Sequence, residues 1–184
     1  MIFKRFFGRN DGREAALSAY RALVAQARSP EFYRNAGVAD TLDGRFDMLV
    51  LHVFLALFRL KSEGEEGKAY GTALLDALFL DMDESLREIG IGDMSVGKKI
   101  KTMASAFYGR VEAYDAGLAA PQPDELVAAI RRNLFPGLKA GEGPDGSEAI
   151  ADYARASAAL MEKQPFADML AGKFHFAPLP LPVA

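Results

Sequence analysis

Cysteine and tryptophan are absent from this 184-residue chain, and histidine occurs only at His52 and His175. A chain without cysteine can form no disulfide framework, thiolate zinc site, iron–sulfur cluster or cysteine nucleophile. Any metal or proton-transfer site must therefore depend mainly on Asp, Glu, Lys or Tyr side chains. The absence of cysteine also fits a reducing compartment.

Positive charge is not in excess, since 22 Lys and Arg residues stand against 25 Asp and Glu residues, for a formal net charge of -3. General nucleic-acid binders usually carry a basic excess, so the composition argues against a general DNA- or RNA-binding role. Apolar residues make up 50% of the chain, which excludes an intrinsically disordered protein. The length predicts one domain, because a compact domain usually takes about 100–200 residues.

A long hydrophobic run is missing as well. The longest apolar run, Met48–Phe58, has 11 residues, whereas a membrane-spanning helix needs about 20. Charged residues interrupt the apolar residues of positions 1–10, so the pattern is not that of a secretory signal peptide. We therefore expect a soluble protein whose membrane contact, if any, is peripheral.

Helical periodicity dominates most of the chain. Asp11 and Glu14 have the spacing of a capping box, Ser29-Pro30 is a second start signal, and Ser95 can cap a later helix. The predicted helices cover residues 11–27, 32–36, 46–60, 69–89, 95–114, 124–134, 147–163 and 165–170, with a polar loop over 62–67 and a helix end at Gly90-Ile91-Gly92. The segment 46–60 is apolar on every side, which predicts a helix buried at the centre of the domain.

The fold class that follows is all-α, with about seven or eight helices in a single compact domain. Its predicted parts are a basic and aromatic N-terminal segment (residues 1–10), the helical domain (11–171) and an extended Pro-rich tail (172–184). Prolines at positions 178, 180 and 182 force extended backbone in this tail.

Three neighbouring carboxylates, Asp81, Asp83 and Glu84, are the strongest catalytic candidates, because paired carboxylates can exchange protons or bind a metal. On a helix, Asp81 and Asp83 point to different sides, so we interpret the group as a solvated helix face. His52 lies within the central helix and is expected to be a hydrogen-bonded core residue. We therefore predict no catalytic residue, no metal and no cofactor.

The N-terminal segment could contact a membrane, because aromatic residues mixed with cations suit the surface of an anionic bilayer. The candidate membrane contacts are Phe3, Lys4, Arg5, Phe6 and Phe7. The alternative is a terminus that packs loosely and contacts nothing.

A basic cluster on the helix after Ser95 is the second candidate contact surface. Its residues are Lys98, Lys99, Lys101, Tyr108 and Arg110. Helical geometry places Lys98 and Lys101 opposite the apolar stripe that runs from Ile100 to Val111. The cluster could bind an acidic protein, ribosomal RNA or lipid headgroups; the alternative is a merely solvated face.

Several short phrases of sequence resemble a known family. They are ARSPEFY (27–33), DTLDGRFD (40–47) leading into Leu51-His52, LFLDMDESLREIGIGD (78–93), VGKK (96–99) and FYGR (107–110). These phrases are similar to those of the ubiquinol–cytochrome c chaperone family, and the resemblance covers roughly residues 17–134.

The resemblance implies a non-enzymatic assembly factor that stabilises newly made cytochrome b for the bc1 complex, respiratory complex III. In mitochondrial members it also implies contact with the ribosome or a second assembly factor. We interpret the early first helix as the lack of a mitochondrial presequence. A bacterial protein, peripheral on the cytoplasmic face of the inner membrane, matches this picture. Two other interpretations stay open: a helical small-molecule-binding protein or enzyme, and an RNA- or ribosome-binding helical module.

Overall fold

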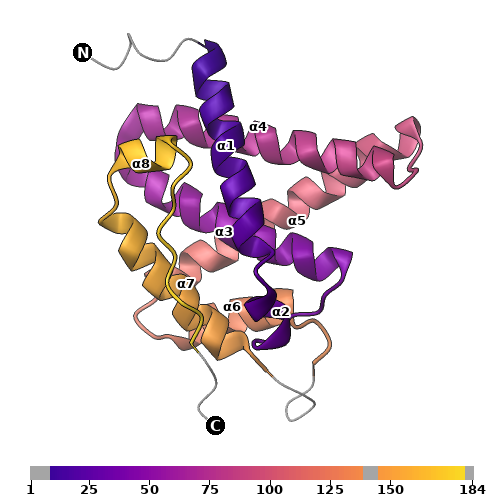
Figure 1. Cartoon of the computed structure of the whole chain (residues 1–184). Coiled ribbons are helices and arrows are strands. Elements are labelled where there is room, and N and C mark those ends of the chain that lie inside the picture. The colour runs from indigo at the N-terminus through magenta and orange to yellow at the C-terminus, as the bar shows by residue number, and fades with distance from the viewer. Residues whose placement is uncertain (1–8, 139–144, 181–184) are drawn as a thin grey trace.

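The computed structural model describes residues 9–138 and 145–180, with side chains from residue 12 onwards (Figure 1). The helices of this part are α1 (Arg9–Ala27), α2 (Pro30–Arg34), α3 (Leu42–Leu60), α4 (Gly64–Glu88), α5 (Asp93–Ala119), α6 (Asp124–Leu134), α7 (Ser147–Glu162) and α8 (Phe166–Leu170). The described residues contain no strand, and the prediction of an all-α fold with seven or eight helices is confirmed. The predicted membrane contacts, Phe3, Lys4, Arg5, Phe6 and Phe7, lie outside the described residues.

Helix α3 is the centre of the domain and packs against α1, α4, α5, α6 and α7. Its start is fixed by Thr41, whose Oγ1 accepts a hydrogen bond from the amide of Gly44 at 3.2 Å. Residues 50–56 are all buried, and a stretch of this length covers about two full turns. No side of the helix therefore faces water there, which confirms the prediction of a buried central helix.

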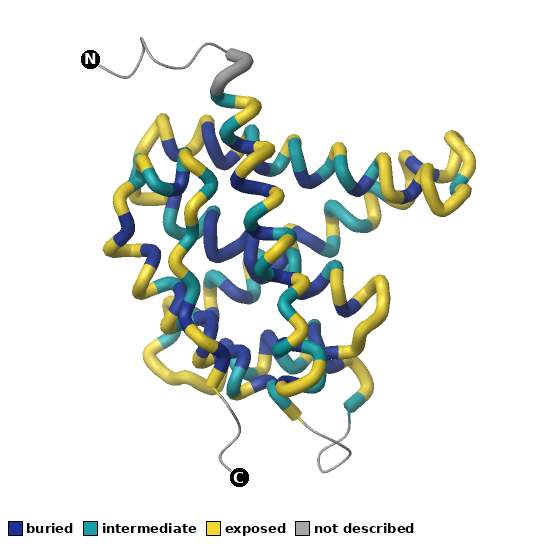
Figure 2. Tube along the Cα trace, in the orientation of Figure 1, coloured by how far each residue is buried: buried dark blue, intermediate teal, exposed yellow. Residues whose placement is uncertain are grey.

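Helices α4 and α5 form a long hairpin whose joined end projects from the rest of the domain (Figures 1 and 2). The chain turns at Gly90, whose φ of +86° is a conformation that glycine adopts without strain. This turn confirms the predicted helix end at Gly90-Ile91-Gly92. The tip exposes two large apolar side chains, Ile89 and Met94.

Residues 62–67 do not form the loop that their composition predicts. Only the short 3₁₀ turn η2 (Lys61–Glu63) separates α3 from α4, and Gly67 already lies within α4. A Cβ atom on Gly67 would lie 2.3 Å from the carbonyl oxygen of Leu60. Glycine is therefore required there by the close approach of α4 to the end of α3 and does not mark a loop.

Two predicted helix caps are also wrong. Helix α1 begins at Arg9, before Asp11, and α5 begins at Asp93, with Gly92 and not Ser95 at the N-cap position. Acidic residues are favourable throughout the first turn of a helix because of its partial positive charge. Such residues therefore locate a helix start only to within about a turn.

The chain after α8 runs back across the domain in extended conformation, as its prolines predict (Figure 1). We call residues 173–179 the strap. Ala177 and Leu179 in the strap are buried and belong to the hydrophobic core. The strap is therefore an integral part of the packing. No helix in the described part of the chain combines the length and the apolar character that crossing a bilayer requires.

Candidate functional site

The strap is anchored at the centre of the domain by aromatic rings. The ring centroid of Phe176 lies 5.1 Å from that of His52 on α3 and 6.3 Å from that of Tyr153 on α7. Phe32 of α2 packs edge-on against the same two rings. Aromatic pairs at these distances are stabilising, so the strap, α2, α3 and α7 are joined at one point.

His52 is fully buried, and both of its ring nitrogens have partners. Nδ1 lies 2.7 Å from the carbonyl oxygen of Met48, which can only accept, so Nδ1 carries the proton. Nε2 then accepts a hydrogen bond from the hydroxyl of Tyr153 at 2.8 Å. Burial lowers the pKa of His52 to about 4, which keeps the ring neutral. The prediction of a hydrogen-bonded core histidine is confirmed.

Side chains at the end of α7 hold the strap by its main chain. Gln164 donates from Nε2 to the carbonyl oxygen of Lys173 at 2.7 Å, and its Oε1 accepts from the amide of His175 at 3.0 Å. The Oγ of Ser157 accepts from the amide of Ala177 at 3.0 Å. These contacts bind backbone groups and do not depend on the side chains that the strap carries.

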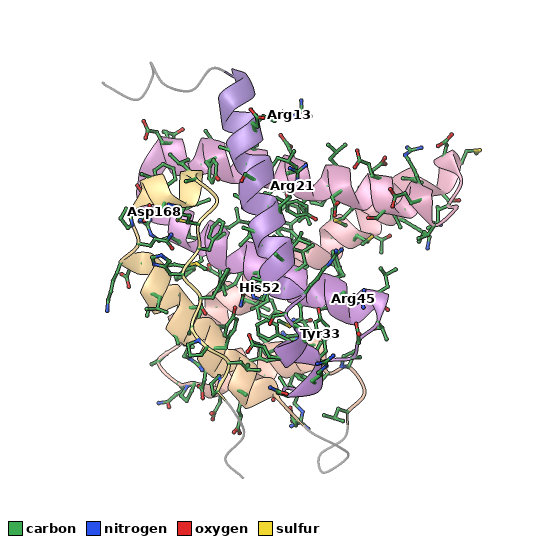
Figure 3. All side chains as sticks on the ribbon, viewed as in Figure 1. Arg13, Arg21, Tyr33, Arg45, His52 and Asp168 are labelled. Atoms are coloured by element: carbon green, nitrogen blue, oxygen red, sulfur yellow. The ribbon has the colours of Figure 1, made fainter. Side chains whose placement is uncertain are left out.

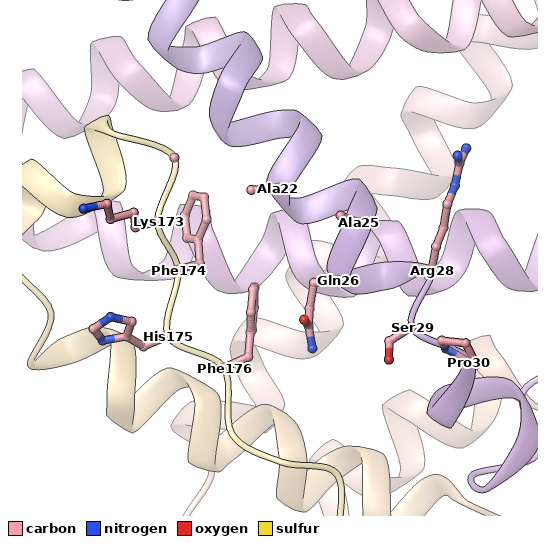
Figure 4. Close-up of a pocket in the computed structure, with 11 residues that line it drawn as sticks. Ala22, Ala25, Gln26, Arg28, Ser29, Pro30, Lys173, Phe174, His175 and Phe176 are labelled. Carbon is pink, nitrogen blue, oxygen red and sulfur yellow. The ribbon is translucent and has the colours of Figure 1, made fainter.

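An open groove of about 800 Å³ lies between the strap and the C-terminal part of α1 (Figure 4). Phe174 and Phe176 project from the strap toward Ala22 and Ala25 of α1, whose small side chains leave the groove unfilled (Figure 4). The polar residues that border it are Gln26, Arg28, Ser29, Lys173 and His175; the side chains of Lys173 and His175 project from the side of the strap opposite Phe174 and Phe176 (Figure 4). The groove therefore has apolar side chains on two sides and cationic residues at its edges.

Exposed cations continue from the groove along α1 and α2. Arg21, Arg28, Arg34 and Lys173 are all exposed, and none of them forms an ion pair within the described residues. Arg13 and Arg21 lie along the same helix, α1, as Figure 3 shows. Positions 13, 21 and 28 are about two turns apart from one to the next, and this spacing is the signal by which the sequence could have revealed the cationic side of α1.

The predicted basic cluster on α5 is only partly assembled. Its exposed members are Lys98, Lys99, Lys101 and Tyr108. Phe107, on the opposite side of α5, is fully buried, as the helical spacing predicts. Arg110 turns away from the lysines toward α3, where its Nη2 lies 2.8 Å from Oδ1 of Asp47. The exposed part of the cluster therefore consists of the three lysines and Tyr108, without Arg110, and Lys99 and Tyr108 lie on opposite sides of the helix.

Asp47 is a buried carboxylate, and burial raises its pKa to about 6 against the opposing effect of the Arg110 charge. Although Nη2 of Arg110 lies close to Oδ1 of Asp47, neither this Oδ1 nor Nε of Arg110 has an aligned hydrogen-bond partner within the described residues. The hydroxyl of Tyr114 is also buried without a partner there, and burial raises the pKa of Tyr114. This polar cluster lies between α3 and α5, away from the groove.

The three carboxylates of α4 do not form one site. Asp81 is half-buried and accepts a hydrogen bond from the hydroxyl of Tyr20 at 2.6 Å, so the interpretation as a solvated face is wrong for this residue. Asp83 pairs with Arg87 at 2.6 Å, and Glu84 is exposed. Over residues 9–138 and 145–180, no three His, Asp or Glu side chains lie where they could together hold a metal ion.

These features define an all-helical domain. Its accessible surface offers an open groove and two cationic faces, while its buried polar side chains, His52 above all, are engaged in packing.

The chain belongs to the ubiquinol–cytochrome c chaperone family, whose model matches residues 34–176. The match extends through α7 into the strap. The chain is similar over 97% of its length to a crystal structure of the Cbp3 homologue from Brucella abortus. The two are 37% identical, 98% of the Brucella chain is covered, and the TM-score is 0.81. The family resemblance of the sequence is thereby confirmed.

Vertebrate relatives are more distant and longer. Ubiquinol-cytochrome-c reductase complex assembly factor 1 of Xenopus laevis is 28% identical over 156 residues, which is 85% of this chain and 76% of that protein. The human protein of the same name is 27% identical over 166 residues, which is 90% of this chain but only 54% of the human protein. The chain thus spans about half the length of its human relative.

Proposed function

We propose that this protein is a non-enzymatic chaperone for the assembly of ubiquinol–cytochrome c reductase, the cytochrome bc1 complex or respiratory complex III. The observation that carries the proposal is the family match over residues 34–176. The relatives named as assembly factors of this complex support it. The accessible features of the fold, a groove and two cationic faces, are suited to binding another macromolecule.

The client in this proposal is newly made cytochrome b, a membrane subunit of the complex. The chaperone binds cytochrome b at the cytoplasmic face of a bacterial inner membrane, and the chaperone itself is peripheral on this membrane. A chaperone needs no reactive side chain for this task. The buried His52 and Asp47 accordingly serve packing and stability, and the surface of the domain carries the function.

Deletion of the gene tests the proposal. We expect the amounts of cytochrome b and of assembled complex III to fall together, as measured by reduced-minus-oxidised spectra and native gels. Expression of the full chain should restore both. The amount of cytochrome c oxidase in the same membranes is the control and should not change. Normal complex III content in the deletion strain would overturn the proposal.

A further inference from the structure

Within the described residues, the main chain of the strap is hydrogen-bonded along one edge, whereas Phe174 and Phe176 leave the other edge unpaired. Lys173, His175 and Ala177 use their backbone groups toward Gln164 and Ser157. Successive residues of an extended chain direct their backbone groups to opposite edges. The intervening Phe174 and Phe176 form no backbone hydrogen bond within the described part of the chain. An extended edge of this kind is a template for another extended chain.

The groove beside the strap has space for the side chains of such a second chain. Its apolar walls are the rings of Phe174 and Phe176 on one side and the methyl groups of Ala22 and Ala25 on the other (Figure 4). It is open to solvent and is bounded by a helix and an extended segment, which suits a linear occupant better than a compact one.

The charges around the groove indicate which charge a bound partner should carry. Arg28 and Lys173 line the groove and are exposed, and Arg21 on α1 lies about two turns before Arg28, which directly follows this helix. The nearby carboxylate of Glu31 accepts a hydrogen bond from the Ser29 hydroxyl at 3.2 Å and keeps its negative charge, but the cations around the groove outnumber it. Free cations at a groove favour acidic partners through charge complementarity.

We propose that this groove binds an extended peptide with alternating acidic and apolar side chains, which pairs with the Phe174–Phe176 edge of the strap. The apolar side chains enter between the strap and α1, the acidic ones project from the other side of the peptide toward Lys173, and the nearby charge of Arg28 adds to the attraction. Addition of a strand to a free edge is an established way to bind peptides, in which main-chain bonds supply affinity and side-chain sites supply specificity. The inference rests on the proposed function only in identifying the peptide as a segment of the client.

The binding test uses the purified full chain and a fluorescent peptide of about eight residues, a usual strand length, in which Glu and Val alternate. The control probe has Lys in place of Glu. We expect saturable binding of the Glu peptide and at least about tenfold weaker binding of the Lys peptide. Hydrogen exchange should slow at the amides of Phe174 and Phe176 when the Glu peptide is bound. Equal binding of the two peptides, or no protection at these two amides, would overturn the proposal.

Two variants locate the site. Ala25→Trp fills the groove from an exposed position on α1, and Ala116→Trp places the same side chain at an exposed position on α5 as the matched control. We expect at least about tenfold loss of peptide affinity for the first and none for the second. Arg28→Glu with Lys173→Glu changes only exposed side chains and should give a similar loss even if Ala25→Trp does not fold. Full affinity in the charge-reversed variant would place the peptide elsewhere and refute the proposal.

Two further outcomes separate this inference from the competing ones. Binding of the chain to phosphatidylglycerol vesicles that depends on Arg28 and Lys173, without any binding of the Glu peptide, would assign the groove to lipid and overturn the peptide proposal. If the peptide binds but the deletion strain has normal complex III, the peptide-binding proposal is supported and the proposed assembly function is refuted. If complex III is lost on deletion but the peptide does not bind, the assembly function is supported and the peptide-binding proposal is refuted.

Discussion

The hydroxyl of Tyr153 on α7 donates a hydrogen bond of 2.8 Å to Nε2 of His52 on α3, in the centre of the domain. The same hydroxyl accepts from Nε2 of Gln26 on α1 at 3.3 Å. Phe176 of the strap packs against both rings. Three helices and the strap therefore meet at one buried hydrogen bond, and its loss should lower the stability of the whole domain.

Tyr153→Phe should lower the free energy of unfolding by about 1–3 kcal/mol, because it leaves Nε2 of His52 buried without a donor. Urea denaturation measures the change. Tyr108→Phe is the matched control, since Tyr108 is 54% exposed, and it should stay within about 0.5 kcal/mol of the parent. Equal effects of the two substitutions would show that the buried bond contributes nothing.

The pH dependence of stability should reveal two buried groups with opposite effects. The pKa of His52 is lowered by burial to about 4, so the unfolded chain binds a proton there more readily, and stability falls as the pH drops below about 6.5. The pKa of Asp47 is raised by burial to about 6. The folded chain therefore binds the proton of Asp47 more readily, and stability rises as the pH drops through about 6.

Asp47→Asn removes the proton uptake by Asp47 in the folded chain and leaves the effect of His52 unchanged. We expect the stability of this variant to fall more steeply than that of the parent between about pH 7 and about pH 5, with His52 contributing a loss of about 2 kcal/mol. Urea denaturation of both proteins at each pH gives the two slopes. Parallel slopes would mean that Asp47 does not take up a proton in this range.

Helical periodicity was sufficient to predict the architecture, because burial of α3 and the inward side of α5 follow directly from where apolar residues recur. Phe107 is fully buried and Lys98 is exposed, as the spacing requires. Helix starts and the predicted loop over residues 62–67 were less reliable. Glycine at position 67 reflects a close contact between two helices, and no local pattern distinguishes that role from a turn.

The candidate site was largely beyond the reach of the sequence. The groove forms because a Pro-rich tail lies beside α1. These two segments are far apart in the sequence, so no local sequence pattern predicts their contact. Arg110 shows the same limit, since its place in a basic run does not reveal that its guanidinium turns toward the buried Asp47. Only the spacing of the arginines on α1 was available as a signal.

Two glycines in α5 should respond to alanine in opposite ways. A Cβ atom on Gly117 would lie 2.7 Å from the Cα atom of Leu126, so Gly117→Ala must push α5 and α6 apart and should cost about 1–3 kcal/mol. A Cβ atom on Gly109 meets nothing within 4 Å. Gly109→Ala should therefore stabilise the helix by about 0.5–1 kcal/mol. Thermal melts of both variants should shift in opposite directions; a shared direction would contradict the packing of α5 against α6.

The exposed lysines of α5 give the last prediction, which concerns a partner-binding face. Lys98 and Lys101 point to solvent, as their helical positions require, and no ion pair involves them within the described residues. Exposed charges contribute little to stability, about 0–1 kcal/mol per pair at most. Clustered charge does speed association with an oppositely charged partner. We propose that this face contacts cytochrome b during assembly, or the ribosome that makes it.

Lys98→Glu with Lys101→Glu should therefore leave the melting temperature unchanged and lower complex III content or ribosome association in cells that carry only this variant. Lys68→Glu with Lys163→Glu makes the same change in net charge at two other exposed positions and should lower neither. Full complex III content with the α5 variant would mean that this face is merely solvated and that the client binds elsewhere, with the groove beside the strap as the next surface to test. A lowered melting temperature would instead contradict the outward placement of the two lysines, because only side chains engaged in packing can destabilise the fold to that extent.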